Sequence, residues 1–198
     1  IHFFKDRANK YSKKGLPFVI FRTGIAMTES GSEELFEQWV EITDSFKKHD
    51  FSHITGFLKS RFLLEQRDFQ GATSILEHTE FDFLKFGYSF QTVFTIKAFL
   101  HDLGFLECSK KELTEAAHRH LAGPDLDLFR ICMEGKKAEP GPLWPHPLYR
   151  PELRLWLALW LEAKGEKEKA RNIVLPCVDK RYGATNSQPA IGKLLARI

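Results

Sequence analysis

The chain has 198 residues, of which 43% are hydrophobic, and its 29 basic and 26 acidic residues give a formal net charge of +3. This composition is globular and excludes a largely disordered chain, while the balanced charge argues against nucleic acid as a partner. No apolar run approaches the roughly 20 residues of a membrane-spanning helix. The three cysteines are widely spaced and the start has no signal-peptide layout, which favours reduced thiols and the cytoplasm. Because the chain opens at Ile1, we expect a piece trimmed from a larger protein.

The first 30 residues combine a basic segment with an apolar one. The basic run from Lys5 to Lys14 predicts a short helix with a solvated face, and a nucleic-acid-binding arm is the alternative. The stretch from Leu16 to Met27 predicts a second helix with Pro17 in its first turn. Its β-branched and aromatic residues leave a buried strand as the alternative.

Two capping-box patterns predict helix starts. Ser30 with Glu33 predicts a helix over about 32–48, and Ser109 with Glu112 predicts one that ends near Leu121. The first of these helices has an apolar stripe that comprises Leu35, Trp39, Val40, Ile42 and Phe46.

The sequence of the middle of the chain predicts further helices joined by short connections. We expect an antiparallel pair over 51–66 and 69–79, then a strongly apolar helix over 88–103 that Gly104 ends. Gly123 and Pro124 should stop the helix that reaches about Leu121, and Asp125 should cap a short helix that reaches Met133.

The last third begins with a segment, 135–150, that holds four of the nine prolines and cannot form a regular helix. A second helical pair is expected to run to about Arg181, with Pro176 bending or ending its second helix. A loop over 183–187 and a final helix that starts at Pro189 should follow and cover the exposed end of the stack.

The two helical pairs share an internal pattern. An offset of 98 residues aligns small or apolar residues, namely Ser60 with Ala158, Leu63 with Leu161, Ala72 with Ala170, Ile75 with Ile173, and Leu76 with Val174. In the second window this pattern resembles the tetratricopeptide repeat (TPR), a helix-turn-helix family, through Leu157, Ala158, Leu161, Gly165, Ala170, Val174 and Cys177. The first window departs from the family at Gly56, where a large apolar residue is usual.

The resemblance implies an all-α fold of eight to ten helices, arranged as antiparallel pairs stacked in a TPR-like right-handed superhelix. We expect one continuous domain made of an N-terminal helical block (1–134), the proline-rich connection (135–150) and a C-terminal TPR-like pair with a capping helix (151–198). A non-repetitive helical domain is the alternative.

The resemblance also implies a protein or peptide partner in a groove lined by first helices. Apolar residues of that groove should stay partly exposed in the unliganded protein. The expected partner-binding residues are Phe57, Arg61, Leu155, Leu159 and Glu162, with Trp144 and Tyr149 on the proline-rich connection as an adjoining wall.

Three residue patterns bear on enzymatic or metal-binding function. His101 and Asp102 are similar to the dyad of HD-type metal phosphohydrolases, but the nearest upstream histidine, His78, does not have the family's spacing. His118 and His120 are two apart on a helix and cannot ligate one ion together. No cysteine has an activating partner nearby in sequence. We therefore predict no catalytic residue, no metal and no cofactor.

These observations predict a scaffold, adaptor or chaperone-like subunit that binds protein or peptide. The alternatives are a metal-dependent enzyme on a helical scaffold and a nucleic-acid-binding regulator that uses the basic N-terminal segment.

Overall fold

The computed structural model describes residues 15–46, 50–79, 91–134, 151–178 and 188–198. Within these ranges all regular structure is helical, in ten α-helices and one 3₁₀-helix, which confirms the predicted all-α class. No helix in the described ranges has both the length and the hydropathy to span a bilayer. The chain forms two compact units, Ile1–Phe81 and Asp82–Ile198, and each is described by itself.

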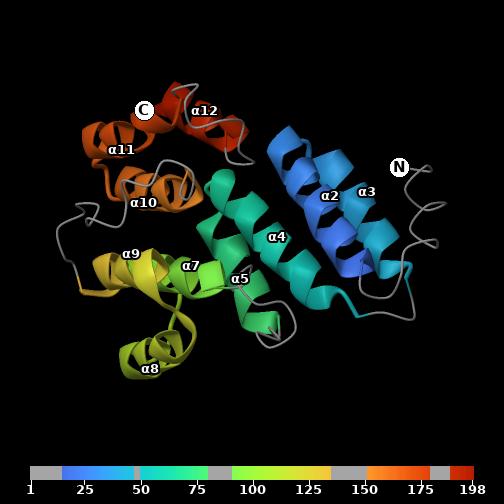
Figure 1. Ribbon diagram of the computed structural model, residues 1–198, viewed down its shortest axis with the longest axis horizontal. Coiled ribbons are helices and arrows are strands. Elements are labelled where there is room, and N and C mark those ends of the chain that lie inside the picture. Colours follow the sequence, from blue (N-terminus) through green and yellow to red (C-terminus); the bar gives the residue numbers. More distant parts are fainter. Residues whose placement is uncertain (1–14, 47–49, 80–90, 135–150, 179–187) are drawn as a thin grey trace. The chain divides into compact units, whose positions relative to one another are not determined.

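Unit 1 consists of two helical pairs (Figure 1). The second pair is tightly packed along its length, and the first helix of the first pair contacts both its own partner and the second pair. The helices are α2 (Leu16–Ser30), α3 (Glu33–Asp44), α4 (Ser52–Glu65) and α5 (Phe69–His78). The segment left open between helix and strand is therefore a helix, with proline in its first turn.

The start of α3 differs from the prediction. Ser30 is the last residue of α2, and Gly31 follows it in the left-handed conformation, with φ of 68°. This glycine turns the chain so that Ser32 has extended backbone, and the Ser32 hydroxyl accepts the Leu35 N–H at 3.3 Å. The predicted capping box at Ser30 was therefore wrong. Gly31 ends α2 directly after Ser30, and the N-cap residue of α3 is Ser32.

Aromatic rings fill the core between α3 and α4. Phe36 and Trp39 are 1% and 3% exposed, and the Phe36 ring stacks on that of Phe62 with centroids 5.1 Å apart. The predicted stripe is correct at Trp39 and Ile42, but Leu35 is 39% exposed. Its neighbour Phe36 takes the core position because a single-residue shift moves a helical side chain by about 100°.

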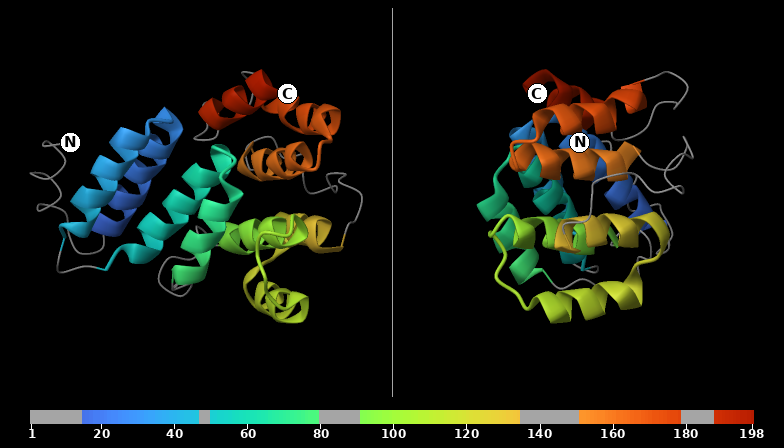
Figure 2. Two further views of the ribbon diagram at one scale, coloured as in Figure 1. Left: turned by 180° about the vertical axis from the view of Figure 1, so that it is seen from behind. Right: turned by 90° about the vertical axis from the view of Figure 1, so that its left-hand side faces the viewer.

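Unit 2 holds the remaining helices (Figures 1 and 2). Helix α7 packs chiefly on α9, and α10 packs chiefly on α11, while α12 contacts α10, α11 and the 3₁₀ turn. Their bounds are α7 (Gln91–Asp102), α8 (Lys110–His120), α9 (Gly123–Glu134), α10 (Pro151–Ala163), α11 (Lys167–Val174), η2 (Leu175–Val178) and α12 (Gln188–Arg197).

Two predicted helix boundaries in unit 2, at Ser109 and Pro176, are confirmed. The Ser109 hydroxyl accepts the Glu112 N–H and caps α8, and Pro176 lies in the 3₁₀ turn that ends α11. Helix α8 ends at His120, just before Gly123 and Pro124, but these two residues are the first of α9, so the expectation that Asp125 caps this helix was wrong. Proline suits the first turn of a helix, where no backbone N–H is needed.

Several expectations fall outside the described residues. They concern the basic segment from Lys5 to Lys14, the proline-rich connection 135–150 with Trp144 and Tyr149, and the loop 183–187.

Candidate partner-binding site

The two aligned helical pairs turn in the same way. At the end of α4 the Asp68 N–H donates to the Leu63 carbonyl at 2.8 Å, and at the end of α10 the Glu166 N–H donates to the Leu161 carbonyl at 2.8 Å. These bonds are related by the 98-residue offset that aligns the sequences. Each belongs to a Schellman turn, which needs one residue with positive φ. That residue is Arg67 in the first copy and Gly165 in the second, with φ of 66° and 82°.

A third turn of this kind ends α7. There the Phe105 N–H donates to the Leu100 carbonyl at 2.8 Å, and Gly104 has φ of 78°. The chain then inserts α8 before α9, the helix on which α7 chiefly packs. Leu100 lies four residues before Gly104, as Leu161 lies four residues before Gly165, and this spacing was a signal that could have predicted the turn.

Small side chains lie where the paired helices touch. Ser60, Ala72, Ala158 and Ala170 are all fully buried, as expected for helices that approach closely. At Gly56, a Cβ would come within 2.4 Å of the Thr79 hydroxyl oxygen. The departure of Gly56 from the family pattern therefore has a local reason, because α4 meets the end of α5 at this position.

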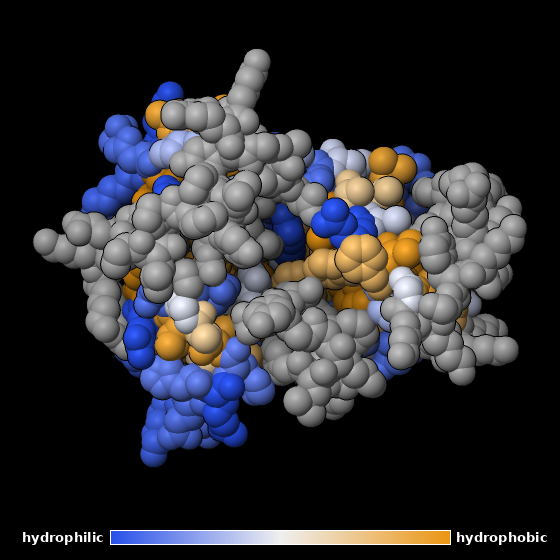
Figure 3. Space-filling model, in the orientation of Figure 1, coloured by the Kyte–Doolittle hydropathy of each residue, from blue (hydrophilic) through white to orange (hydrophobic). Residues whose placement is uncertain are grey.

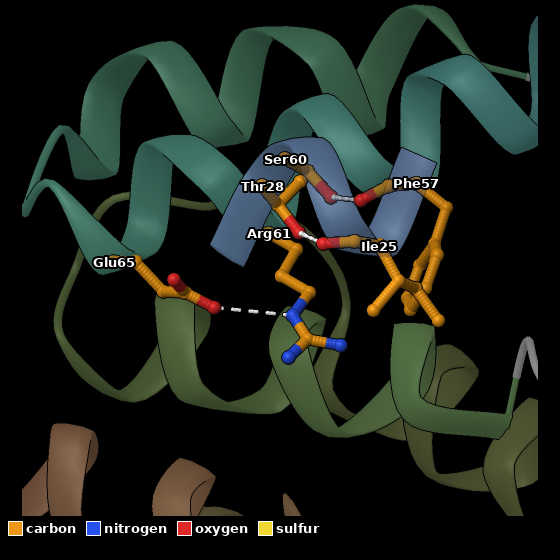
Figure 4. A network of polar contacts seen from close by, with 6 residues as sticks. All are labelled: Ile25, Thr28, Phe57, Ser60, Arg61 and Glu65. Carbon is orange, nitrogen blue, oxygen red and sulfur yellow. Dashed lines mark hydrogen bonds and ion pairs between the residues drawn. The ribbon is translucent and has the colours of Figure 1, made fainter. Parts of the chain in front are cut away.

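The predicted binding residues of unit 1 are buried. Phe57 and Arg61 are each 2% exposed, and the Phe57 ring stacks on Phe21 of α2 at a centroid distance of 6.2 Å. The Arg61 Nε donates to Glu65 Oε1 at 3.1 Å, and Figure 4 shows both side chains on the same side of α4. The expected partial exposure of Phe57 was thus wrong, because α2 supplies an aromatic partner that sequence periodicity did not identify.

The predicted binding residues of unit 2 are also buried. Leu155, Leu159 and Glu162 are 0%, 4% and 5% exposed. Helix α10 is apolar on nearly all sides, which is the pattern of a central helix. It contacts α9, α11 and α12, so the expected partial exposure of Leu159 was wrong too.

The Glu162 carboxylate has a cationic partner on α12. The Arg197 Nε donates to Glu162 Oε1 and an Arg197 terminal nitrogen donates to Oε2, both at 3.2 Å. This is a two-bond arrangement of the kind that orients arginine and carboxylate specifically. The side chain of Arg197 is 32% exposed, whereas that of Glu162 is 3% exposed, so the pair stands at the edge of the core.

A second carboxylate joins α7 to α10. Asp102 Oδ2 accepts the Trp160 indole N–H and the Lys164 ammonium, each at 2.9 Å, and the ammonium also lies 4.6 Å from the Trp160 ring centroid. The sequence pattern indicated Asp102 only as a candidate metal ligand and carried no signal for this role. In the described part of the chain, no three metal-ligating side chains come together.

The histidines considered as ligands take other positions. His78 lies in unit 1, with its Nδ1 2.7 Å from the Ser74 carbonyl oxygen. His118 and His120 lie exposed in the last turn of α8, where the His120 ring stacks on Phe94. Figure 3 shows a hydrophilic surface over α8.

Two cysteines of unit 2 are kept as thiols by burial. Burial raises the pKa of Cys132 far above its ordinary value, nearby Asp102 adds to the increase, and Lys164 opposes it. Burial also raises the pKa of Cys177, against a smaller opposing effect of Arg154. Raised thiol pKa values are the reverse of what a cysteine nucleophile needs.

Comparisons of the chain with family models, with curated proteins and with solved structures found no match.

Proposed function

We propose that this chain is a protein- or peptide-binding helical-repeat module that acts as a scaffold, adaptor or chaperone-like subunit. The observation that supports it is the recurrence of one helical hairpin, with matched turn hydrogen bonds at Leu63 and Leu161. Stacked hairpins of this type are widely used as extended binding surfaces. The TPR-like superhelix belongs to this proposal.

The first helices of the hairpins are the proposed binding elements. Helix α4 buries Arg61 together with its ion-pair partner Glu65, and α10 buries Glu162, so both helices carry charged groups among mainly apolar buried residues. An apolar surface with few charged anchors suits a helical partner segment better than a charged tail. Burial of these residues means that binding requires the surrounding elements to move aside.

Affinity capture followed by reconstitution tests the proposal. The full chain should retain a partner in stoichiometric amounts, and the purified pair should bind directly in calorimetry. We expect Arg61→Lys or Glu162→Gln to weaken that binding by roughly tenfold, the loss typical of one charge-assisted hydrogen bond. Glu168→Gln is the matched control, because Glu168 is an exposed acid on α11.

Circular dichroism and thermal melting must show that each variant remains folded at the assay temperature. A module that retains no stoichiometric partner, or a partner that binds all three folded variants as well as the wild type, would contradict the proposal. Measured turnover of a small-molecule substrate would favour the enzyme alternative.

A further inference from the structure

Glu162 places a carboxylate inside the apolar surface of α10. A buried carboxylate is costly unless a cation and hydrogen bonds compensate for lost hydration. Arg197 provides both through its two bonds to the carboxylate oxygens. Helix α12 therefore does more than cover α10, since it brings a cation to a charged group that would otherwise be buried against apolar neighbours.

Helix α12 depends on this docking for its own stability. It has ten residues, fewer than the roughly 12–15 that an isolated helix needs for even marginal stability in water. Ala190, Ile191 and Leu194 form its buried side, with exposures of 5%, 1% and 0%. Figure 2 shows α12 beside α10 and α11.

A glycine weakens α12 without a packing reason. Gly192 lies within the helix and is exposed, and a Cβ built there would meet no atom within 4 Å. Glycine in a helix interior is unfavourable by about 1 kcal/mol relative to alanine. The helix thus combines a specific ionic anchor with low intrinsic helical stability, which are properties of a segment that can leave its site.

We propose that α12 is a displaceable internal occupant of the partner site on α10, and that the partner is an amphipathic helix with a basic anchor. This inference rests on the proposed function and specifies the class of its ligand. The partner helix should carry two apolar residues and a basic residue at the spacing of Ile191, Leu194 and Arg197, three residues apart in each step.

Charge decides which competitor can replace α12. A helix without a cation, or with an acidic residue at that place, would leave the Glu162 carboxylate buried without compensation. A helix with arginine or lysine there restores the charge pairing. The site should therefore discriminate for basic amphipathic helices even though most of its contact surface is apolar.

Hydrogen exchange of the full chain tests whether α12 opens by itself. The amides of α12 should exchange faster than those of α10 and α11, and Arg197→Gln should accelerate them roughly tenfold further, because it removes a charged double hydrogen bond. Arg171→Gln, at an exposed arginine on α11, is the matched control and should change nothing. Gly192→Ala should slow exchange in α12, since it strengthens the helix.

A labelled peptide of residues 188–198 tests whether the vacated site accepts a helix from outside. It should bind the full Arg197→Gln chain at least about tenfold more tightly than the wild type, in which the tethered helix competes at high effective concentration. Adding Glu162→Gln to that chain should abolish the gain, and a peptide with glutamine at its arginine position should show none. A full chain with Gly192→Ala should bind the peptide more weakly than the wild-type chain, because its own α12 competes more strongly.

Two results would overturn the inference. One is exchange of α12 amides only together with those of α10 and α11, which would make α12 a permanent part of the core. The other is peptide binding that ignores the substitutions at Glu162 and Arg197. Either result leaves the proposed function intact if the full chain still binds its captured partner, so the two failures are distinguishable.

Discussion

Two glycines in helices should respond in opposite directions to the same substitution. A Cβ at Gly24 would lie 2.4 Å from Leu58 Cδ1 and 2.5 Å from a Trp39 ring carbon, so Gly24→Ala should force α2 away from its neighbours. We expect a loss of roughly 1–3 kcal/mol in the free energy of unfolding, as for an overpacked core. Equilibrium urea denaturation measures it.

Gly192→Ala is the control for this substitution, since the space around Gly192 is open. Here the higher helix propensity of alanine should add roughly 0.5–1 kcal/mol of stability. Equal effects at the two sites would show that the close approach at Gly24 does not determine the packing of α2.

Leu159 and Leu161 distinguish a binding surface from a core. Both are buried, with exposures of 4% and 2%, although only Leu161 was expected to be. We therefore expect Leu159→Ala and Leu161→Ala each to cost about 2–5 kcal/mol of stability, measured by chemical denaturation. A Leu159→Ala protein of nearly wild-type stability would restore the prediction of a partly exposed groove.

At the scale of the element, the repeated turns give a paired test. Arg67 occupies a left-handed position that disfavours side chains, whereas Gly165 occupies the equivalent position without that cost. Arg67→Gly should stabilise the chain by roughly 0.5–1 kcal/mol, and Gly165→Ala should destabilise it by about as much. Thermal unfolding with calorimetry measures both.

The signs matter more than the sizes in this test. Opposite signs would support equivalence of the two hairpins, and the same sign at both sites would contradict it. Arg171→Gly, within α11, is a useful contrast because glycine in a helix interior should destabilise.

Helix boundaries in this chain were predictable where local chemistry decides them. Ser109 and Pro176 were correctly assigned because capping and the missing proline N–H act over three or four residues. The errors came where two signals compete at one place. At Ser30, capping residues occur on both sides of a left-handed glycine, and at Gly123 a helix-breaking pair can equally begin a helix.

At the scale of the whole molecule, the all-α class followed from periodicity, but the exposure of individual helices did not. The repeat pattern by itself predicts that the apolar face of α4 lines an exposed groove. In the structure this face is covered at Phe57, whose ring stacks on Phe21 of α2. The ion pair between Glu162 and Arg197 joins residues 35 positions apart in sequence. Such pairings arise from tertiary packing, and no local pattern specifies them.

Unit 2 should unfold cooperatively, and its buried cysteines can report this. Cys132 on α9 and Cys177 in η2 are 1% and 0% exposed, whereas Cys108 is exposed. Pulsed alkylation with increasing urea should modify Cys108 in the native protein and the other two only at one shared midpoint. Different midpoints for Cys132 and Cys177 would show that α9 and the C-terminal helices open separately.

The same two thiols should make unit 2 less stable at alkaline pH. Burial raises the pKa of Cys132 and Cys177 above the ordinary thiol value of 9.0, so the folded chain keeps protons that the unfolded chain loses. Their contribution to stability is therefore fully present below pH 9 and is lost as pH rises above it. Each thiol can contribute a slope of up to about 1.4 kcal/mol per pH unit in the free energy of unfolding.

Urea denaturation at a series of pH values between 8 and about 10 measures this slope. The upper end is set by tyrosine and lysine, whose ordinary pKa values lie near 10 and whose titration would add to the slope. Cys132→Ala should make the chain less stable at all pH values, because it leaves a cavity, but should also make the pH dependence shallower. Cys108→Ala is the control, since Cys108 is exposed. If the slope is the same in Cys132→Ala and the wild type, the buried thiol does not couple protonation to folding, and other groups must account for any alkaline loss of stability.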